Sequence, residues 1–303
     1  VGDSQYLVVE SDESDGSFLK LAPIIAAVTN IDREHLDHYK TFPAILDAFT
    51  DFINKVPFYG VAILCLDDEH VQRVLPRITR RTITYGTTAL VDLRVEDVQT
   101  GHLRSQFRLR LRNQDLGVFH INVPGFHNVL NATAATAVGL ELGVPVETIR
   151  AGLDRYSGVD RRFQIRGVAN GITVIDDYGH HPTEIRATLA AARACKFNRV
   201  LAIFQPHRYT RTHHLMDEFA PTFNQADSVQ VLDLCAASEK PIEGVTAGVL
   251  CQRMQDFGHR SVNYAGTIDN AVAATLADAR EGDCVITLGA GNVWQAGEKI
   301  LAS

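Results

Sequence analysis

The sequence predicts an α/β protein, and two observations support this. Short continuous apolar runs rich in Val and Ile are typical of parallel strands buried on both faces. They occur at residues 6–9, 24–29, 61–66, 172–175, 200–204, 229–234 and 284–288. Stretches with helical periodicity lie between several of them, at residues 42–55, 128–142, 182–194, 215–226 and 270–280. This alternation indicates βαβ units.

Two further features indicate how the chain is divided. Residues 87–123 alternate apolar and polar side chains, which predicts antiparallel strands half exposed to water. A helix after "GVPVETI" ends near Ser157-Gly158 and a charge cluster, and strand–helix alternation then restarts. We expect one domain over residues 1–157 and a second, Rossmann-like domain over residues 158–303.

Composition excludes several classes of function. The 303 residues carry a net charge of −7, whereas a nucleic-acid-binding protein needs a basic surface. The five cysteines are scattered, which favours buried thiols in a reducing compartment. No leader and no apolar run of about 18 residues is present, so we expect a cytoplasmic protein that binds no membrane. The chain opens directly on an expected strand, and we expect it to be part of a larger protein.

Three polar segments follow expected strands in the second half. They are "DDYGHHPTE" after residue 175, "QPHRYTRT" after residue 204 and "GAGNVWQAG" after residue 288. In a parallel sheet the carboxyl ends of the strands share one rim, where ligands bind. The three segments therefore predict a single site.

Each segment permits a plainer interpretation. Pro182 and Glu184 place His180 and His181 at a helix N-terminus, where free N–H groups hold an anion. A helix cap with solvated histidines is the alternative, and a zinc site is disfavoured because adjacent residues point apart. Arg208 and Arg211 are three residues apart, so on a helix turn they would share one face and suit a carboxylate or phosphate; a solvated basic turn is the alternative.

The segment "GAGN" resembles a dinucleotide fingerprint, but Trp294 stands where the third glycine belongs. It is better interpreted as a tight turn between a strand and a helix. A dehydrogenase that uses a nicotinamide cofactor is therefore a disfavoured alternative function.

The first half carries a second group of polar residues. "VVESDESDG" and "VTNIDREHLDHY" place acidic residues and histidines after two expected strands, which suits a divalent cation or simply solvated turns. Asn128 and Asn131 open an Ala-rich helix, where their amides either read a purine edge or cap the helix.

Taken together, the chain resembles the Mur ligase family. The resemblance rests on motifs in family order: "ESDESDGSFL", "VTNIDREHLDHY", "PGFHNVLNATAA", "GVDRRFQ", "IDDYGHHPTE", "FQPHRYTRT" and "GAGNVWQ". "DDYGHHPTE" with "QPHRYTRT" resembles the branch that adds L-alanine to UDP-N-acetylmuramate, and is less similar to the murein-peptide ligases. The implied fold is a partial P-loop-type central domain followed by the Rossmann-like domain.

The resemblance implies an activity. ATP phosphorylates the lactyl carboxylate of UDP-N-acetylmuramate, and the amine of L-alanine then attacks the acyl phosphate. The substrates are small molecules, and the protein is expected to be a monomer or a weak homodimer. A binding module without catalysis, derived from the same family, is the rival interpretation.

The resemblance also implies residue roles. Glu10 and His35 are similar to ligands of Mg²⁺, Asn128 and Asn131 to adenine contacts, Arg162 to a phosphate contact and Asp177 to a ribose contact. His180, Arg208 and Arg211, with Tyr178 nearby, are implied to face the amino acid and the acyl phosphate. Arginines and Mg²⁺ suit the charge that develops on phosphorus.

One motif departs from the family. The 303 residues contain no G-x-x-x-x-G-K-[ST], the loop that cradles the phosphates of ATP. We therefore expect this chain to be a ligase fragment that is inactive alone.

Overall fold

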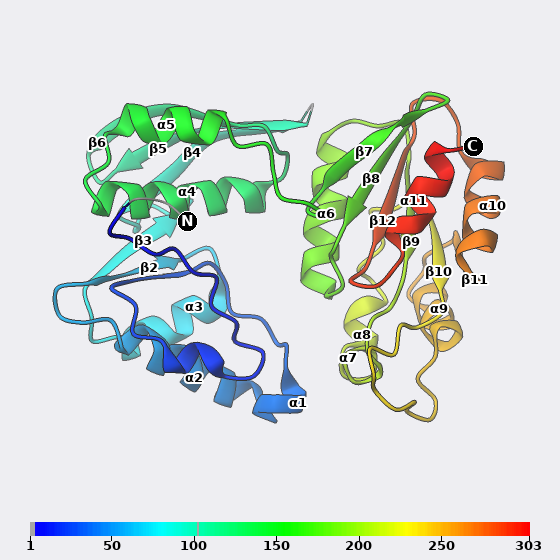
Figure 1. Ribbon diagram of the computed structural model, residues 1–303, viewed down its shortest axis with the longest axis horizontal. Coiled ribbons are helices and arrows are strands. Elements are labelled where there is room, and N and C mark those ends of the chain that lie inside the picture. The colour runs from blue at the N-terminus through cyan, green and yellow to red at the C-terminus, as the bar shows by residue number, and fades with distance from the viewer. Residues whose placement is uncertain (1–3, 102) are drawn as a thin grey trace. The chain divides into compact units, whose positions relative to one another are not determined.

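The computed structural model describes residues 4–101 and 103–303. Within this part of the chain, contacts between Cα atoms define two compact units (Figure 1). The first contains residues 4–96, 108–117 and 130–149, and the second contains the remainder, including everything from Arg150 onward. The boundary expected after residue 157 stays a prediction.

A six-stranded sheet begins the fold, with the strands in chain order from β1 to β6. β1, β2, β3 and β4 are parallel to one another. Two residues join β5 to β6, a connection that only antiparallel neighbours permit, and this confirms the antiparallel strands expected within residues 87–123. The strands are β1 (Ile25–Val28), β2 (Val61–Cys65), β3 (Thr82–Gly86), β4 (Leu93–Gly101), β5 (Arg104–Leu111) and β6 (Gln114–Ile121).

The helices of this region accompany the parallel strands and follow β6. Thr41 caps α2 by accepting from the N–H of Ala44, and Ile45, Phe52 and Ile53 of α2 are buried. The helices are η1 (Ser17–Lys20), α1 (Leu36–Tyr39), α2 (Phe42–Asn54), α3 (Glu69–Val74), η2 (Leu75–Arg77), α4 (Phe126–Glu141) and α5 (Val146–Asp154). The helices expected near residues 42–55 and 128–142 are confirmed.

The strand expected at residues 6–9 is wrong. These residues have no regular secondary structure, and Leu7 and Val8 are 86% and 92% exposed. An apolar run becomes a strand only where a neighbouring strand pairs with it. In the structure β1 is one edge of the first sheet, and Ile24 beside it is also exposed.

The second sheet has the order β11-β10-β9-β12-β8-β7, and all neighbours are parallel except β7 and β8. Its strands are β7 (Gln164–Ala169), β8 (Ile172–Asp177), β9 (Val200–Phe204), β10 (Ser228–Leu232), β11 (Val262–Gly266) and β12 (Cys284–Leu288). The strands expected at residues 172–175, 200–204, 229–234 and 284–288 are confirmed. This is the Rossmann-like architecture predicted from the sequence.

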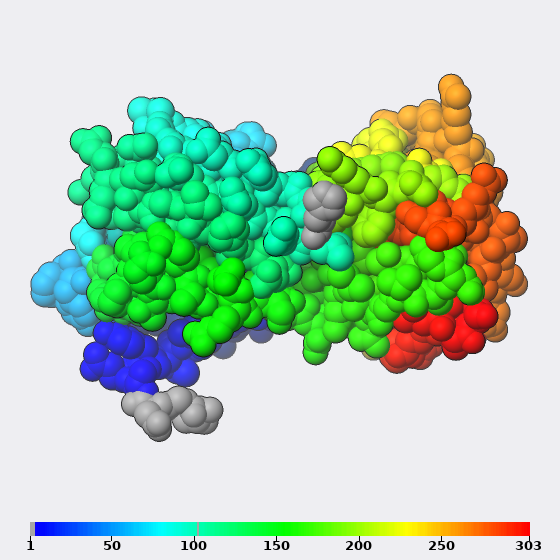
Figure 2. Space-filling view, turned by 90° about the horizontal axis from the view of Figure 1, so that it is seen from above, coloured from blue at the N-terminus to red at the C-terminus, as the bar shows by residue number. Residues whose placement is uncertain are grey.

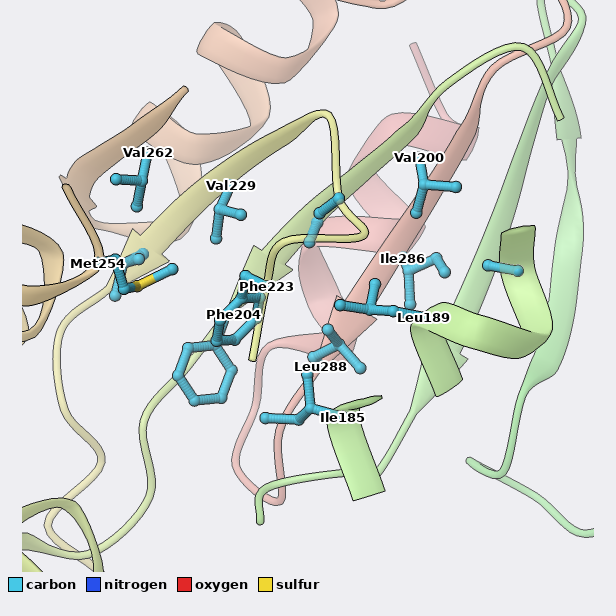
Figure 3. Close-up of a cluster of buried hydrophobic side chains, with 14 of the residues drawn as sticks. Ile185, Leu189, Val200, Phe204, Phe223, Val229, Met254, Val262, Ile286 and Leu288 are labelled. Carbon is cyan, nitrogen blue, oxygen red and sulfur yellow. The ribbon is translucent and has the colours of Figure 1, made fainter. Parts of the chain in front are cut away.

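Helices cover both faces of this sheet. On one face Ile185 and Leu189 of α6 pack with Phe204, Ile286 and Leu288 of the strands (Figure 3). On the other face Leu201 and Ile203 join Val272 of α10 and Ile300 of α11. Alternate residues of β9 thus enter different cores, which explains why its five residues are all apolar.

The helices of the second sheet are α6 (Pro182–Ala194), α7 (Tyr209–His214), α8 (Met216–Phe219), α9 (Ala247–Asp256), α10 (Ile268–Asp278) and α11 (Trp294–Leu301). Figure 2 shows α11, in red, lying against the green surface of β7 and β8. Gly167 and Gly297 permit this approach, because a Cβ atom there would lie 3.1 Å from Leu301 and from Val174 respectively.

One expected helix has different bounds. In place of a helix over residues 215–226, α7 and α8 are two short helices interrupted at Leu215. Pro221 lacks the N–H that would continue α8 beyond Ala220. The sequence also did not identify α9 or the edge strand β11, whose polar residues mask their periodicity.

The cysteines behave as expected from composition. Cys65, Cys195, Cys251 and Cys284 are buried free thiols, and Cys235 is half-buried. Burial raises the pKa of Cys251 to about 11, which keeps the thiol protonated and unreactive. None of the helices in the described residues combines the length and apolar character needed to span a bilayer.

Candidate functional site

The three polar segments meet at one rim of the second sheet, as predicted. β12 lies between β8 and β9, and its Leu288 is in register with Asp177 on one side and Phe204 on the other. The N–H of Gly289 donates to the carbonyl oxygen of Asp177 (3.1 Å), and the N–H of Gln205 donates to that of Leu288 (3.0 Å). The residues that follow these strands are therefore neighbours.

The two aspartates of "DDYGHH" end β8 and do not form a loop. Both are buried, and Asp176 pairs with Arg161 (Oδ2 to Nε, 2.9 Å) while accepting from the Thr287 hydroxyl (2.6 Å). Asp177 accepts from the N–H groups of Phe163 (2.8 Å) and Gly179 (2.7 Å). Burial raises the pKa of Asp177 despite these bonds. Its carboxylate thus orders the rim, and its role toward a ribose stays a prediction.

The adjacent histidines have different environments. His181 is the N-cap of α6, which confirms the expected cap, but it is 1% exposed, so the expectation of a solvated side chain is wrong for this residue. The side chain of Glu184 completes a capping box by accepting from the N–H groups of His180 (3.0 Å) and His181 (3.2 Å). Burial raises the pKa of Glu184, but His180 and Arg162 outweigh it and the pKa is lowered.

His180 is half-buried and lies among aromatic rings. Its Nδ1 is 2.9 Å from the carbonyl oxygen of Tyr178, and its ring meets that of Tyr178 edge-on at 5.3 Å. The ring centroid of His207 lies 5.9 Å from that of His180. His180 therefore connects the segment after β8 to the segment after β9.

The segment after β9 carries the two arginines. The guanidinium of Arg211 lies against His207, with Nη1 3.4 Å from Nδ1 and 3.3 Å from the carbonyl oxygen. Arg208 precedes α7 with a left-handed φ of 69°, and its Nη1 is 3.9 Å from Glu239. Arg208 is therefore not helical, which corrects the expectation that both arginines share one face of a helix turn.

Glu239 and His207 were not recognised as site residues from sequence. Glu239 accepts from the N–H (3.0 Å) and hydroxyl (2.6 Å) of Thr210, and so fixes the start of α7. No sequence signal identifies Glu239, because it lies in a loop beyond β10. His207 lies within "QPHRYTRT", but its spacing from Arg208 and Arg211 did not indicate a role in the site.

The segment after β12 is a tight turn, as predicted. Gly289 has a φ of 144°, and a Cβ atom there would lie 2.9 Å from the carbonyl oxygen of Gln205. A Cβ atom on Gly291 would lie 2.2 Å from Oε1 of Gln205, whose Nε2 donates to Asn292 (3.0 Å). The glycines therefore serve the packing of Gln205 against the turn, and α11 begins at Trp294.

Arg162 lies next to the start of β7 and is half exposed. Its Nη1 donates to Glu184 (3.0 Å), and its Cζ lies 5.6 Å from the centre of the Tyr178 ring. The structure thus brings Arg162, Tyr178, His180 and Arg211 into one connected group at the rim.

The acidic segments of the first unit are separate from this rim in sequence and form their own group. His35, with a φ of 57°, has Nε2 3.5 Å from Oε1 of Glu13, and Tyr39 donates to the carbonyl oxygen of Glu13 (2.6 Å). Asp12 and Asp15 accept from the N–H groups two residues ahead. Glu10 is exposed.

The fit of this group to a cation is partial. Within residues 4–101 and 103–303, no three His, Cys, Asp or Glu side chains are grouped so as to hold a metal ion. Mg²⁺ keeps several waters and needs only one or two protein carboxylates beside phosphates, so Glu10, with Glu13 nearby in sequence, fits that limited demand. The pairing of Glu10 with His35 as ligands stays a prediction.

The two asparagines lie in the first turns of α4. Asn128 donates from Nδ2 to the carbonyl oxygen of Pro124 (2.7 Å), just before the helix, and Asn131 is exposed. A donor does not satisfy the free N–H groups of a helix start, so capping by these amides and contact with adenine both stay predictions.

Comparison with known proteins gives the family. Residues 2–139 match the Mur ligase middle domain, and residues 161–291 match the Mur ligase, glutamate ligase domain. The chain belongs to the Mur ligase family.

Two relatives of high sequence identity carry the same name. A UDP-N-acetylmuramate–L-alanine ligase of Solibacter usitatus is 65% identical over 301 residues, covering 99% of this chain and 64% of that protein. A ligase of the same name from Desulfatibacillum aliphaticivorans is 51% identical, covering 100% and 67%. The chain thus spans about two thirds of the length of these relatives.

A solved structure has the same fold. The UDP-N-acetylmuramate-alanine ligase MurC of Thermotoga maritima matches with a TM-score of 0.77 at 24% identity, covering 96% of this chain and 62% of that one. At this identity the likeness shows the fold alone.

Proposed function

We propose that this chain forms part of an ATP-dependent ligase that adds L-alanine to the lactyl carboxylate of UDP-N-acetylmuramate in the cytoplasm. The observation that carries the proposal is the convergence of Arg162, Tyr178, His180 and Arg211 at one rim, with Arg208 next to His207 in the chain. The names of relatives up to 65% identical support the substrate. The reaction belongs to peptidoglycan precursor synthesis.

The arginines after β9 are proposed to bind the carboxylate of L-alanine. A guanidinium offers a planar pair of N–H donors that matches a carboxylate. Held in this way, the amino acid presents its amine to the activated carbonyl carbon, which converts a collision into an oriented attack. His180 and Tyr178 border the same place and limit how the amino acid can turn.

Arg162 is proposed to meet the phosphates. The acyl phosphate forms when the lactyl carboxylate attacks the γ-phosphorus of ATP and ADP leaves, and the amine then displaces phosphate. Negative charge develops at phosphorus in the first step, where a fixed cation stabilises it. Arg162 is half exposed and cationic, as this role requires.

The nucleotide and Mg²⁺ are assigned by resemblance. Asn128 and Asn131 are proposed to contact adenine and Asp177 the ribose, while Glu10 and His35 would hold Mg²⁺. The cation, when bound, would neutralise charge at the phosphates. The protein residues bind the nucleotide and orient its phosphates.

A second candidate is a binding module that retains these contacts without turnover. It is favoured by one observation: the 303 residues lack the G-x-x-x-x-G-K-[ST] loop. We accordingly propose that the chain alone does not ligate, and that a protein with the full length of its relatives does.

The test is a kinetic one. The full-length protein should release ADP only when UDP-N-acetylmuramate, L-alanine and Mg²⁺ are all present, whereas the 303-residue chain should not. Arg211→Ala should raise KM for L-alanine by about tenfold or more, because a charge-assisted contact is lost. His213→Ala, exposed on the same helix, is the matched control and should change nothing.

Two results would redirect the proposal. Much more efficient ligation of another amino acid would overturn the substrate assignment. Ligation of a peptide in place of the single amino acid would instead identify a murein-peptide ligase.

A further inference from the structure

Arg161 connects three segments of the second sheet, although its neighbour Arg162 was the residue singled out from sequence. It precedes β7 and has a left-handed φ of 59°. Its own N–H donates to Gln164 Oε1 (3.0 Å), and its carbonyl oxygen accepts from the N–H of Tyr178 (2.6 Å). A left-handed φ is unfavourable for a residue with a side chain, and hydrogen bonds to the N–H and to the carbonyl oxygen of Arg161 hold it in this conformation.

The Arg161 side chain reaches across the ends of two strands. Nε donates to Asp176 Oδ2 (2.9 Å) at the end of β8, and Nη2 donates to the carbonyl oxygen of Gly289 (2.7 Å) after β12. The carbonyl oxygen of Gly291 lies 3.4 Å from the same Nη2. A lysine ammonium is a single point of charge and lacks this planar fork.

Tyr178 is held by the same residue. The Cζ of Arg161 lies 4.9 Å from the centre of the Tyr178 ring, a cation–π contact in addition to the backbone bond. Arg161 thus sets both the main chain and the ring of a residue that borders the proposed amino-acid position.

The two adjacent arginines differ in exposure. The side chain of Arg161 is 25% exposed and pairs with an aspartate that is almost wholly buried, whereas that of Arg162 is 52% exposed and pairs with the more accessible Glu184. A buried carboxylate fixes a guanidinium, because separating the pair leaves an uncompensated charge. Arg161 is consequently the more buried and fixed member of the two, and Arg162 the more exposed one.

We propose that Arg161 is a positioning residue for the ligation: it fixes Tyr178 and the Gly289–Gly291 turn, and through Tyr178 it sets the binding of the incoming amino acid. This inference rests on the proposed function. Arg161 itself contacts neither L-alanine nor UDP-N-acetylmuramate.

The first test compares Michaelis constants in the full-length protein. Arg161→Lys and Arg161→Gln should raise KM for L-alanine by about tenfold while KM for UDP-N-acetylmuramate changes less than about twofold. A residue with a purely structural role would lower the fraction of active enzyme, which reduces the maximal rate and leaves both constants unchanged.

Arg199→Lys is the matched control. Arg199 also pairs with a buried aspartate, Asp283 (Nη2 to Oδ2, 2.7 Å), but it lies at the opposite ends of the strands, just before β9. This variant should lose stability and keep both Michaelis constants. An equal rise in KM for L-alanine would overturn the inference.

The second test needs no catalysis. Trp294 is the only tryptophan in the 303 residues and begins α11 directly after the turn that Arg161 holds. In this chain Arg161→Gln should shift the emission of Trp294 to longer wavelength and increase its quenching by acrylamide, whereas Arg199→Lys should do neither.

The two tests separate the failures. If the full-length protein does not ligate L-alanine, the proposed function falls and with it the role of Arg161 in ligation. If it ligates, but the Arg161 variants keep KM for L-alanine and the emission of Trp294, Arg161 is not a positioning residue.

Discussion

The imidazole of His207 lies against the guanidinium of Arg211, with Nδ1 3.4 Å from Nη1. Arginine offers donors only, so Nδ1 of His207 is the acceptor and the imidazole is neutral in this pair. Burial and the nearby charges of Arg211, His180 and Arg208 lower the pKa of His207 to about 4. His207 therefore stays neutral near pH 6.5, where a histidine with an ordinary pKa gains or loses its proton.

The first prediction concerns the titration of His207. Histidine NMR on the chain should show one ring that titrates near pH 4, and His207→Gln should remove that signal. Because the unfolded chain binds the proton with a pKa near 6.5, stability should rise with pH between about 4 and about 6.5. His207→Gln should lose part of this dependence, and His214→Gln, an exposed control, should keep all of it. A His207 ring that titrates near 6.5 would contradict the prediction.

The second prediction concerns the capping box at α6. Glu184→Ala removes the acceptor of the His180 and His181 N–H groups and should lower the free energy of unfolding by about 1 kcal/mol. Urea denaturation measures this change. Glu184→Gln keeps an acceptor and should recover part of the loss.

Glu298→Ala is the control for this prediction, because it breaks only an exposed ion pair with Arg166, and it should cost less than about 0.5 kcal/mol. A cost as large as that of Glu184→Ala would count against the capping box.

These contacts show which parts of the site could be predicted from sequence. The cap at His181 and Glu184 is local, three residues apart, and "HHPTE" indicates it directly. The shared rim also follows from local patterns, because continuous apolar runs predict parallel strands and a parallel sheet aligns their ends. The helical conformation expected for Arg208 was wrong, because an isolated bridge between His207 and Cys235, beyond the ends of β9 and β10, holds its backbone through the bond from its N–H to the carbonyl oxygen of Cys235.

Other contacts could not be predicted, because they join distant segments. Arg161 donates to Gly289, 128 residues along the chain, and no spacing rule connects such a pair. Residues 6–9 illustrate the opposite error: their pattern fits a strand, but strand formation depends on a pairing neighbour that the pattern does not specify.

The third prediction concerns the turn after β12. Gly291→Ala places a Cβ atom 2.2 Å from Gln205 Oε1, so the turn or Gln205 must move, and the free energy of unfolding should fall by about 1–3 kcal/mol. Thermal denaturation measures the fall. Gln205→Ala in the same chain removes the obstructing atom, and the double variant should be more stable than the sum of the single effects. Gly248→Ala, where a Cβ atom would make only an ordinary contact with Thr246 at 3.8 Å, is the control and should not destabilise. Strict additivity at Gly291 and Gln205 would refute the proposed clash.

The fourth prediction concerns the buried ion pair at the opposite ends of the strands. Arg199 donates to Asp283 (2.7 Å) and to Asp278 (3.0 Å), and Asp283 is 2% exposed. Burial alone would raise the pKa of Asp283, but the bonds from Arg199 and the N–H of Arg280 outweigh it and the pKa is lowered. The folded state therefore gains stability above the unfolded pKa of about 3.9, and loses it as pH falls through the lower folded value.

Asp283→Asn should accordingly lower the free energy of unfolding at pH 7 by about 3 kcal/mol, because Arg199 keeps its charge and loses its buried partner. The variant should also lose part of the acid-induced destabilisation that the unchanged chain shows below pH 4. Asp269→Asn, which breaks an exposed pair with Lys299, is the control and should cost less than about 1 kcal/mol. Urea titrations at pH 7 and pH 3.5 measure both effects, and equal losses at the two pH values would show that ionisation of Asp283 contributes nothing.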